Sequence, residues 1–169
     1  PATPPGLSAI AVVRVSGNAA IDLVTRLFHG KKLTEAATHT VHLGTLYDEV
    51  GAIDEVMATV YREPHSFTRE NSVEISSHGS PLIVQRIIRA LVHEGAVIAA
   101  PGEFTKRAFL NGRFDLAQAE AIADLINAEN DNARQAALNQ MRGGFSKQIQ
   151  RLRDELIHFA SLIELELDF

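Results

Sequence analysis

Cysteine and tryptophan are both absent from this chain of 169 residues. The lack of cysteine excludes disulfides, thiolate catalysis and cysteine-based zinc sites, and it fits the cytoplasmic location that we expect. No apolar run is long enough to cross a bilayer and no signal-peptide pattern opens the chain, so no membrane partner is expected. Aromatic residues make up 6% of the chain and apolar residues 46%, which predicts a core of Ile, Leu, Val and Ala.

Motifs of common nucleotide-binding and catalytic sites are also missing. A phosphate-binding loop needs an early glycine and then Gly-Lys followed by Ser or Thr. Here Gly30-Lys31 is followed by Lys32, and the earlier glycine is absent. The zinc-protease, nucleophile-elbow and dinucleotide-binding patterns are absent too. The chain is therefore not expected to hydrolyse a nucleoside triphosphate, or to be catalytic, on its own.

A surplus of positive charge is lacking as well, because the net charge is −5. Nucleic-acid modules usually carry a basic face, since neutralising phosphates supplies most of their affinity. The nearest approach to a basic cluster is the set Lys106, Arg107 and Arg113. The composition thus opposes an RNA-binding module that relies on bulk electrostatics.

Short β-branched runs alternate with two amphipathic stretches between Ile10 and Ala100. Period-two patterns predict strands, and apolar spacings of three and four predict helices. The predicted strands are Ile10–Val15, Thr40–Tyr47, Asp54–Tyr61, Ser72–Ser76 and Val97–Ala99, and the predicted helices run from an Asn18 cap to Phe28 and from Leu82 to Val92. This order indicates an α+β fold, with two helices against a mixed or antiparallel sheet.

From Asp115 onward the pattern is helical. Asp115 is placed to cap a helix, with Gln118 reaching back as in a capping box. After a polar break at Glu129–Asn132, a second apolar stripe runs from Leu138 to Ile163, and Gly143-Gly144 can bend or interrupt it. We therefore predict domains at residues 1–114 and 115–169.

The helical stripe has no partner within the chain, so we expect it to pack on a continuation of the chain or on another subunit. The start at Pro1 rather than Met, and the helical pattern still running at Phe169, suggest that both ends are cuts.

Three residues invite both a plain and a functional interpretation. Arg14 interrupts an apolar strand, so its charge is either solvated or paired, and the pattern favours the solvated face. Glu74 shares a strand face with Ser72 and Ser76. It is interpreted either as an exposed side chain or as a carboxylate in a pocket. His78 ends that strand. It is interpreted either as a turn residue that bonds to backbone groups or as a pocket residue at a strand terminus.

Other candidates are weaker or more general. His39 and His42 have opposite parity on a predicted strand, which argues against a shared metal ion. The extended lead-in Ala2–Gly6 is stiff and can lie along a partner. Asn111 begins an Asn-Gly turn that presents Arg113 just ahead of the helical half.

Taken together, three stretches resemble the signature segments of the MnmE (TrmE) family of tRNA modification GTPases. They are Ala2–Gly6 with Val12–Gly17, Pro64–Gly79, and Pro101–Ile126, in the family's order. The resemblance covers essentially the whole chain, and the third segment is the most specific. It implies an N-terminal folate-binding and dimerisation domain, similar to folate-dependent aminomethyltransferases, followed by the first helices of a helical domain that lacks its inserted GTPase domain.

The resemblance also implies cofactors and partners. The family binds a tetrahydrofolate derivative, such as 5-formyl- or 5,10-methylene-tetrahydrofolate, and its missing domain uses GTP, Mg²⁺ and K⁺. It works as a homodimer with an FAD-containing partner, MnmG (GidA), and modifies C5 of the wobble uridine of tRNA within the assembled complex, using the folate one-carbon unit. Alternatives are a stand-alone folate-dependent one-carbon transferase, an RNA-binding module, and a dimerisation domain without a ligand.

The family's folate contacts fall at Arg14, Glu74 and Arg113, with His78 and Asn111 as weaker candidates. A carboxylate can accept the paired N–H groups of a reduced pterin, and guanidinium groups suit its carbonyl and carboxylate groups. The chain departs from the usual family pattern at two places. Leu7-Ser8-Ala9 stands where many members have Arg-Gly-Gly, and Arg69-Glu70-Asn71 replaces the commoner Gly-Glu-Asp. Arg113 is Lys in some members.

Overall fold

A computed structural model describes residues 1–167 of the chain, which divide into two compact units. Unit 1 comprises Pro1–Asn111 and unit 2 comprises Gly112–Phe169. The predicted cut at Phe169 lies outside the described residues.

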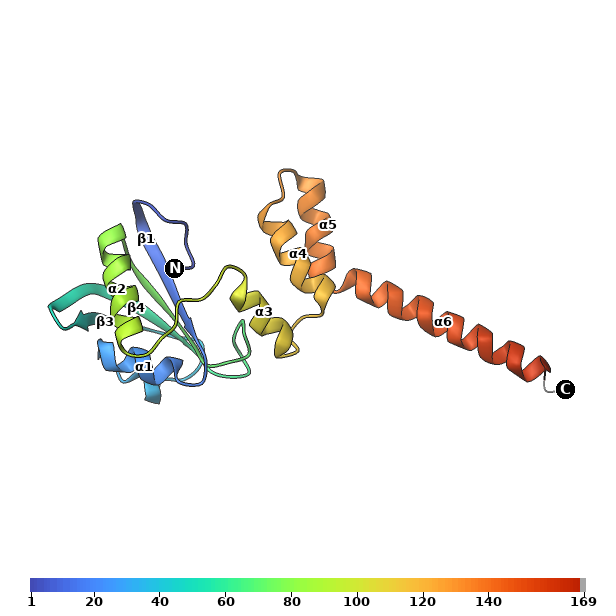
Figure 1. Cartoon of the computed structure of the whole chain (residues 1–169), viewed down its shortest axis with the longest axis horizontal. Coiled ribbons are helices and arrows are strands. Elements are labelled where there is room, and N and C mark those ends of the chain that lie inside the picture. Colours follow the sequence, from blue (N-terminus) through green and yellow to red (C-terminus); the bar gives the residue numbers. More distant parts are fainter. Residues whose placement is uncertain (168–169) are drawn as a thin grey trace. The chain divides into compact units, whose positions relative to one another are not determined.

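Unit 1 is built on a five-stranded antiparallel sheet with the strand order β1-β5-β4-β3-β2. Figure 1 labels β1, β3 and β4 of this sheet and the helices α1 and α2. The strands are β1 (Ser8–Ser16), β2 (Phe28–Gly30), β3 (Thr40–Asp48), β4 (Gly51–Tyr61) and β5 (Ser72–Gly79). Helices α1 (Ala20–Leu27), α2 (Pro81–His93) and α3 (Glu103–Leu110) and the short 3₁₀ helix η1 (Leu33–Glu35) complete the unit. The predicted α+β class is confirmed, and the sheet is antiparallel throughout.

The core lies between the sheet and the helices α1 and α2. Val60 of β4 and Ile75 of β5 are fully buried, and they pack in one cluster with Val24 of α1 and Ile87 of α2. Successive residues of a strand point to opposite faces of the sheet. Val73 and Ile75 of β5 point into the core, so Glu74 between them points to the opposite face. The opposite face of the sheet is thus where polar side chains of β1 and β5 can meet.

The predicted Asn18 cap is wrong. Helix α1 starts at Ala20, its cap position is Ala19, and no side chain caps it. Backbone carbonyls accept the first N–H groups of the helix instead: the Ala20 N–H donates to the Gly17 carbonyl, and the Leu23 N–H donates to the Ala19 carbonyl. Gly17, with φ +136°, makes the tight turn that brings its carbonyl to the helix start.

The predicted strand Val97–Ala99 is also wrong, since this segment forms no ladder with the sheet. The end of α2 turns sharply at Gly95, and the Ala96 N–H bonds back to the Leu91 carbonyl. Val97 and Ile98 then run through solvent, with 91% and 73% of their surface exposed. A β-branched pair is therefore not enough to define a strand where no neighbouring edge is available.

Strand β2 was not predicted, because three residues are too few to show a period. Phe28, expected as the helix end, is instead its first residue and pairs with Leu46 of β3. The Phe28 ring lies against Gly44, where a Cβ atom would collide with the ring and come within 2.7 Å of the His29 carbonyl oxygen. Glycine in the middle of β3 thus makes room for a buried aromatic ring.

Unit 2 contains three helices, α4 (Leu116–Ile126), α5 (Asp131–Met141) and α6 (Gly144–Leu167). The predicted capping box of Asp115 and Gln118 is confirmed. Helices α4 and α5 form a hairpin, in which the Gln118 side chain donates to the Met141 carbonyl at 2.9 Å. Gly143, with φ +79°, ends the α5 segment, so the glycine pair interrupts the predicted long helix.

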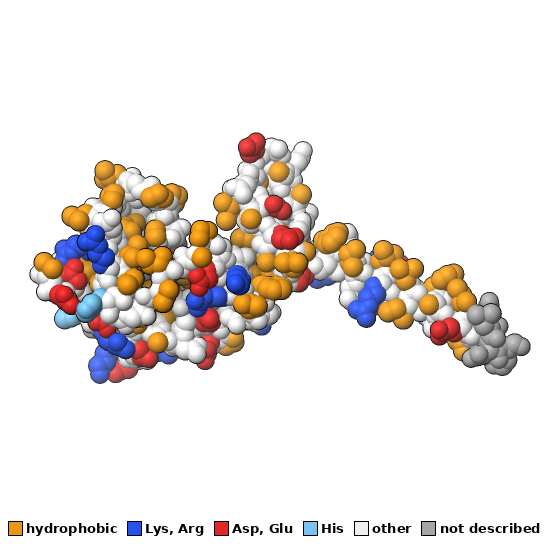
Figure 2. All heavy atoms as spheres, viewed as in Figure 1, with side chains coloured by type: hydrophobic (Ala, Val, Ile, Leu, Met, Phe, Trp, Pro, Cys, Tyr) orange, Lys and Arg blue, Asp and Glu red, His pale blue; other side chains and the backbone are white. Residues whose placement is uncertain are grey.

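Helix α6 exposes a row of large apolar side chains, and Figure 2 shows apolar side chains following the helix. Its exposed large apolar residues include Phe145, Ile149, Leu152, Leu156, Phe159 and Ile163. Among residues 1–167, no helix has both the length and the apolar character needed to cross a membrane.

Replacing Gly44 by Ala should destabilise unit 1 by about 1–3 kcal/mol, because the added methyl group forces the Phe28 ring or the β2 backbone to move. Both tyrosines of the chain, Tyr47 and Tyr61, lie in unit 1 and there is no tryptophan, so near-ultraviolet circular dichroism in urea follows this unit. The neighbouring exposed change Leu43→Ala should stay within about 0.5 kcal/mol. Equal midpoints for the two variants would contradict the packing role of Gly44.

Candidate functional site

Arg14 of β1 and Glu74 of β5 lie directly opposite each other in the sheet. The Arg14 Nε and Nη2 atoms both donate to Glu74 Oε1, at 2.8 and 2.6 Å. The side chains are 28% and 25% exposed, so the pair is largely shielded while still reaching the surface. The sequence pattern favoured a solvated Arg14, and this is corrected: the cross-strand register places a carboxylate opposite it.

Tyr61 of β4 completes the polar group around Glu74. Its hydroxyl donates to Glu74 Oε2 at 3.2 Å. Burial, and next the negative charge of Glu74, raise the pKa of Tyr61 above the ordinary value of 10.0, so the phenol keeps its proton and remains a donor. Sequence reasoning missed Tyr61, since only the pairing of β4 with β5 brings it beside Glu74.

Two aromatic rings contact the Arg14 guanidinium from other parts of unit 1. The Phe67 ring, from the loop between β4 and β5, has its centre 5.4 Å from Arg14 Cζ, and the Phe104 ring of α3 has its centre 5.5 Å away. Such contacts contribute roughly 0.5–1 kcal/mol each at partly exposed sites. Arg14 is therefore held from three sides, by a carboxylate and by two ring faces.

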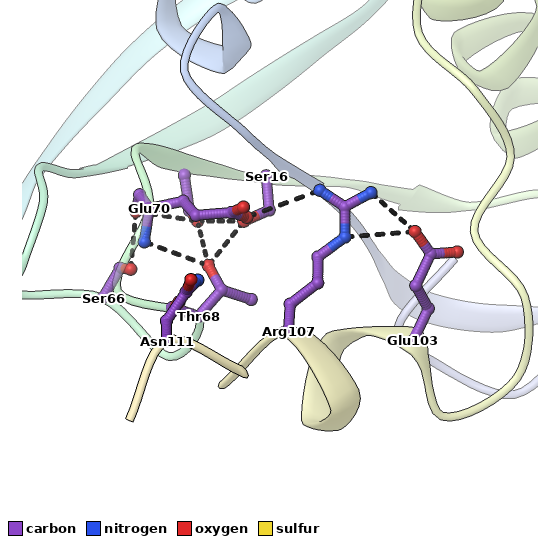
Figure 3. A network of polar contacts seen from close by, with 8 residues as sticks. Ser16, Ser66, Thr68, Glu70, Glu103, Arg107 and Asn111 are labelled. Carbon is purple, nitrogen blue, oxygen red and sulfur yellow. Dashed lines mark hydrogen bonds and ion pairs between the residues drawn. The ribbon is translucent and has the colours of Figure 1, made fainter. Parts of the chain in front are cut away.

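A polar network fixes the loop that carries Phe67, as Figure 3 shows. Thr68 is fully buried, and its hydroxyl lies 2.5 Å from the Ser16 hydroxyl at the end of β1. Ser16 also donates to Glu70 Oε2 at 2.9 Å. These bonds tie residues far apart in sequence to one corner of the sheet, next to Arg14.

Helix α3 joins the same network through Arg107. Its guanidinium donates to Glu103 Oε1 at 2.6 Å and contacts Glu70 Oε2 at 3.5 Å. The hydrogen bond from Arg107, followed by the Ala100 N–H, lowers the pKa of Glu103 below its ordinary 4.5. Since Phe104 sits on this helix, Arg107 helps hold one of the two rings that contact Arg14.

Asn111 anchors the end of α3 to the same loop. Its side-chain amide donates to the Thr68 carbonyl at 2.7 Å, and its own carbonyl accepts a hydrogen bond from Arg69 at 3.2 Å. Arg69 has φ +60°, a conformation that glycine adopts freely and that costs other residues roughly 1 kcal/mol. A structural role of Asn111 is thus visible, and its predicted ligand contact stays a prediction.

His78 is the exposed member of a second polar pair. Its ring Nδ1 lies 2.8 Å from Asp54 Oδ1, and its backbone N–H donates to Asp54 Oδ2 at 2.8 Å. The His78 side chain is 71% exposed and that of Asp54 only 10%. Strand β5 continues to Gly79, so His78 lies within the strand and not in a turn. Sequence reasoning singled out His78 but missed Asp54.

Arg113 belongs to unit 2, and its guanidinium lies 5.2 Å from the centre of the Phe114 ring. That Arg113 contacts the same ligand as Arg14 and Glu74 stays a prediction. His39 lies just before β3 with φ +60°, and not on the strand as expected. Within residues 1–167 there is no group of three or more His, Asp and Glu side chains arranged to hold a metal ion.

Comparisons with known proteins identify the family of both units. The family described as GTP-binding protein TrmE N-terminus matches residues 1–113, and the one described as MnmE helical domain matches residues 116–169. Proteins called tRNA modification GTPase MnmE are 55% identical over 168 residues in Cytophaga hutchinsonii and 56% identical over 171 residues in Christiangramia forsetii. In each case 99% of this chain is covered but only 36% of the relative.

Replacing Arg107 by Met should lower the thermal midpoint of unit 1 at about pH 7, and the loss should shrink as the pH falls below about 4. The sign follows from Glu103: a carboxyl whose folded pKa is lowered stabilises the fold above its unfolded pKa and loses this contribution as it becomes protonated. Circular dichroism melts over this pH range provide the measurement. Lys31→Met, at an exposed position elsewhere in unit 1, is the control and should change little. A pH-independent difference would contradict the ionic role of Arg107.

Proposed function

The chain belongs to the MnmE (TrmE) family of tRNA modification GTPases, and on this premise we propose that unit 1 binds a reduced folate at Glu74 and Arg14. The ligand is a tetrahydrofolate derivative, such as 5-formyl- or 5,10-methylene-tetrahydrofolate. The single observation that supports this most is the partly shielded Glu74 carboxylate, which Arg14 and Tyr61 hold in a fixed orientation.

Glu74 retains acceptor capacity for a ligand. A carboxylate offers about four lone-pair positions. Oε1 accepts both donors of Arg14 and Oε2 accepts the Tyr61 hydroxyl, so one position remains, on Oε2. One N–H of a pterin ring can bond to Oε2, and a neighbouring N–H can bond to Oε1 when Arg14 gives up one of its two bonds there.

Arg14 and the two phenylalanines add features that suit the rest of a pterin. Two nitrogens of Arg14 bond Glu74, which leaves donors on Nη1 for a carbonyl or carboxylate of the ligand. Phe67 and Phe104 offer ring faces beside the same guanidinium, where a planar ring system can stack. In the proposal Arg113 supplies a further cation from unit 2, and His78 and Asn111 are weaker contacts.

For the protein as a whole we propose the role that its relatives' name describes, modification of tRNA coupled to a GTPase. The chain spans about 36% of the length of these relatives. The proposal assigns GTP, Mg²⁺ and K⁺ to sites that these residues do not form. We propose that residues 1–114 form the domain through which the protein makes a homodimer, and that residues 115–169 begin a helical domain. The proposed partner is the FAD protein MnmG, and the assembled complex binds tRNA. The proposed location is the cytoplasm. The folate donates a one-carbon unit to C5 of the wobble uridine.

Calorimetry with 5-formyl-tetrahydrofolate tests the folate site. Glu74→Gln should weaken binding by about 10–100-fold, because hydrogen bonds to a charged group contribute roughly 1.5–3 kcal/mol. Tyr61→Phe should have a smaller effect in the same direction, since it removes one donor that orients the carboxylate. Glu55→Gln, at an exposed position of the neighbouring strand β4, is the matched control and should bind like wild type.

Two outcomes would overturn the proposal. A folded wild-type chain that fails to bind any reduced folate would remove the function. Equal affinities of wild type and Glu74→Gln would move the site elsewhere. Turnover of a methylene donor by the chain alone would favour the alternative, a stand-alone one-carbon transferase.

A further inference from the structure

The pair of His78 and Asp54 differs in kind from the other ion pairs of unit 1. The Asp54 side chain is only 10% exposed, and His78 supplies both the ring Nδ1 and the backbone N–H that bond to its carboxylate. In the described part of the chain no Lys or Arg pairs with Asp54. A carboxylate with so little exposure needs hydrogen-bond donors, and here one residue supplies both.

The local fold explains how Asp54 reaches this position. The ladder between β4 and β5 ends at the pair Met57 and Ser76. Beyond it the His78 N–H has no strand partner on β4, and Asp54 Oδ2 accepts it instead. The same carboxylate is thereby oriented so that its other oxygen faces the ring.

This geometry determines which ring nitrogen carries the proton. Because Nδ1 faces a carboxylate, it holds the hydrogen of the neutral ring, and the lone pair of Nε2 points to the exposed side. No other charged group is bonded to the ring in the described residues: Glu55 follows Asp54 on β4, and the β1 residues that face His78 and Gly79, namely Ile10 and Ser8, are uncharged. A histidine that is hydrogen-bonded to a carboxylate through one ring nitrogen and exposes the other to solvent has the arrangement of a general base.

We propose that Asp54 and His78 form a proton-transfer pair that acts on an N–H or O–H group of a ligand bound to unit 1. The ligand's proton moves to His78 Nε2, the bonding electrons stay on the ligand's nitrogen or oxygen, and Asp54 remains ionised and stabilises the imidazolium. The reverse step returns the proton. His78 lies four residues from Glu74 on β5, roughly 13 Å along the strand. The inference rests on the proposed function, because it assigns the pair to the reaction of a ligand held at Glu74.

The tautomer provides the first test. Nitrogen-15 NMR of the neutral ring should find the proton on Nδ1 in the wild-type chain. In Asp54→Asn the amide oxygen can keep the backbone N–H while the amide nitrogen faces the ring, so the ring proton should move to Nε2. A wild-type ring protonated on Nε2, or no change in Asp54→Asn, would overturn the proposed pair.

Activity provides the second test, in the full-length protein with its partner and tRNA. His78→Gln should lower turnover by about 100-fold or more, the range of general acid–base catalysis, and should remove the histidine-dependent limb of the pH profile. The thermal midpoint and the affinity for 5-formyl-tetrahydrofolate should change much less. His93→Gln is the matched control, since His93 is equally exposed at 68% and also lies beside a carboxylate, that of exposed Glu49.

The two proposals fail in different ways. Wild-type protein that does not bind 5-formyl-tetrahydrofolate contradicts the folate site. Wild-type binding together with full turnover and an unchanged pH profile in His78→Gln contradicts the proton-transfer pair alone. A loss of turnover matched by an equal loss of thermal stability would assign His78 a structural role and overturn the inference too.

Discussion

The antiparallel pairing of β1 with β5 is the constraint on which the rest of unit 1 depends. It joins the first strand of the chain to the last, across about 60 residues, and thereby places Arg14 opposite Glu74. A one-residue change in this register would turn one of the two side chains into the core. Unpaired, either charge would be costly at this level of burial, so the register and the ion pair support each other.

Around this pair, hydrogen bonds, an ion pair and aromatic rings hold the surrounding segments. Buried Thr68 binds the loop to β1, Asn111 binds the end of α3 to the loop, and Arg107 links α3 to Glu70. Each of these bonds spans tens of residues in sequence. The consequence is a corner of the sheet where a carboxylate, a guanidinium, a phenol and two phenyl rings have defined positions before any ligand arrives, which lowers the entropic cost of binding.

Unit 2 presents a different physical situation. Its hairpin of α4 and α5 is closed by capping and by side-chain bonds to carbonyls, whereas α6 leaves its apolar residues in solvent. A helix with such a side gains most of its stability from packing on something else. This chain covers about a third of the length of its relatives.

The sequence by itself determined the fold class, most elements of the sheet, the Asp115 capping box and the interruption at Gly143, because these depend on short periods and on local hydrogen bonds. It also pointed to Arg14, Glu74 and His78, although only as residue types at unusual places in strands. Only the tertiary structure decided that Arg14 is paired, that Tyr61 and Asp54 are the partners of Glu74 and His78, and that Phe28 begins a strand. These facts depend on strand register and on contacts between distant segments, and a pattern along one chain carries no information about which strand lies beside which.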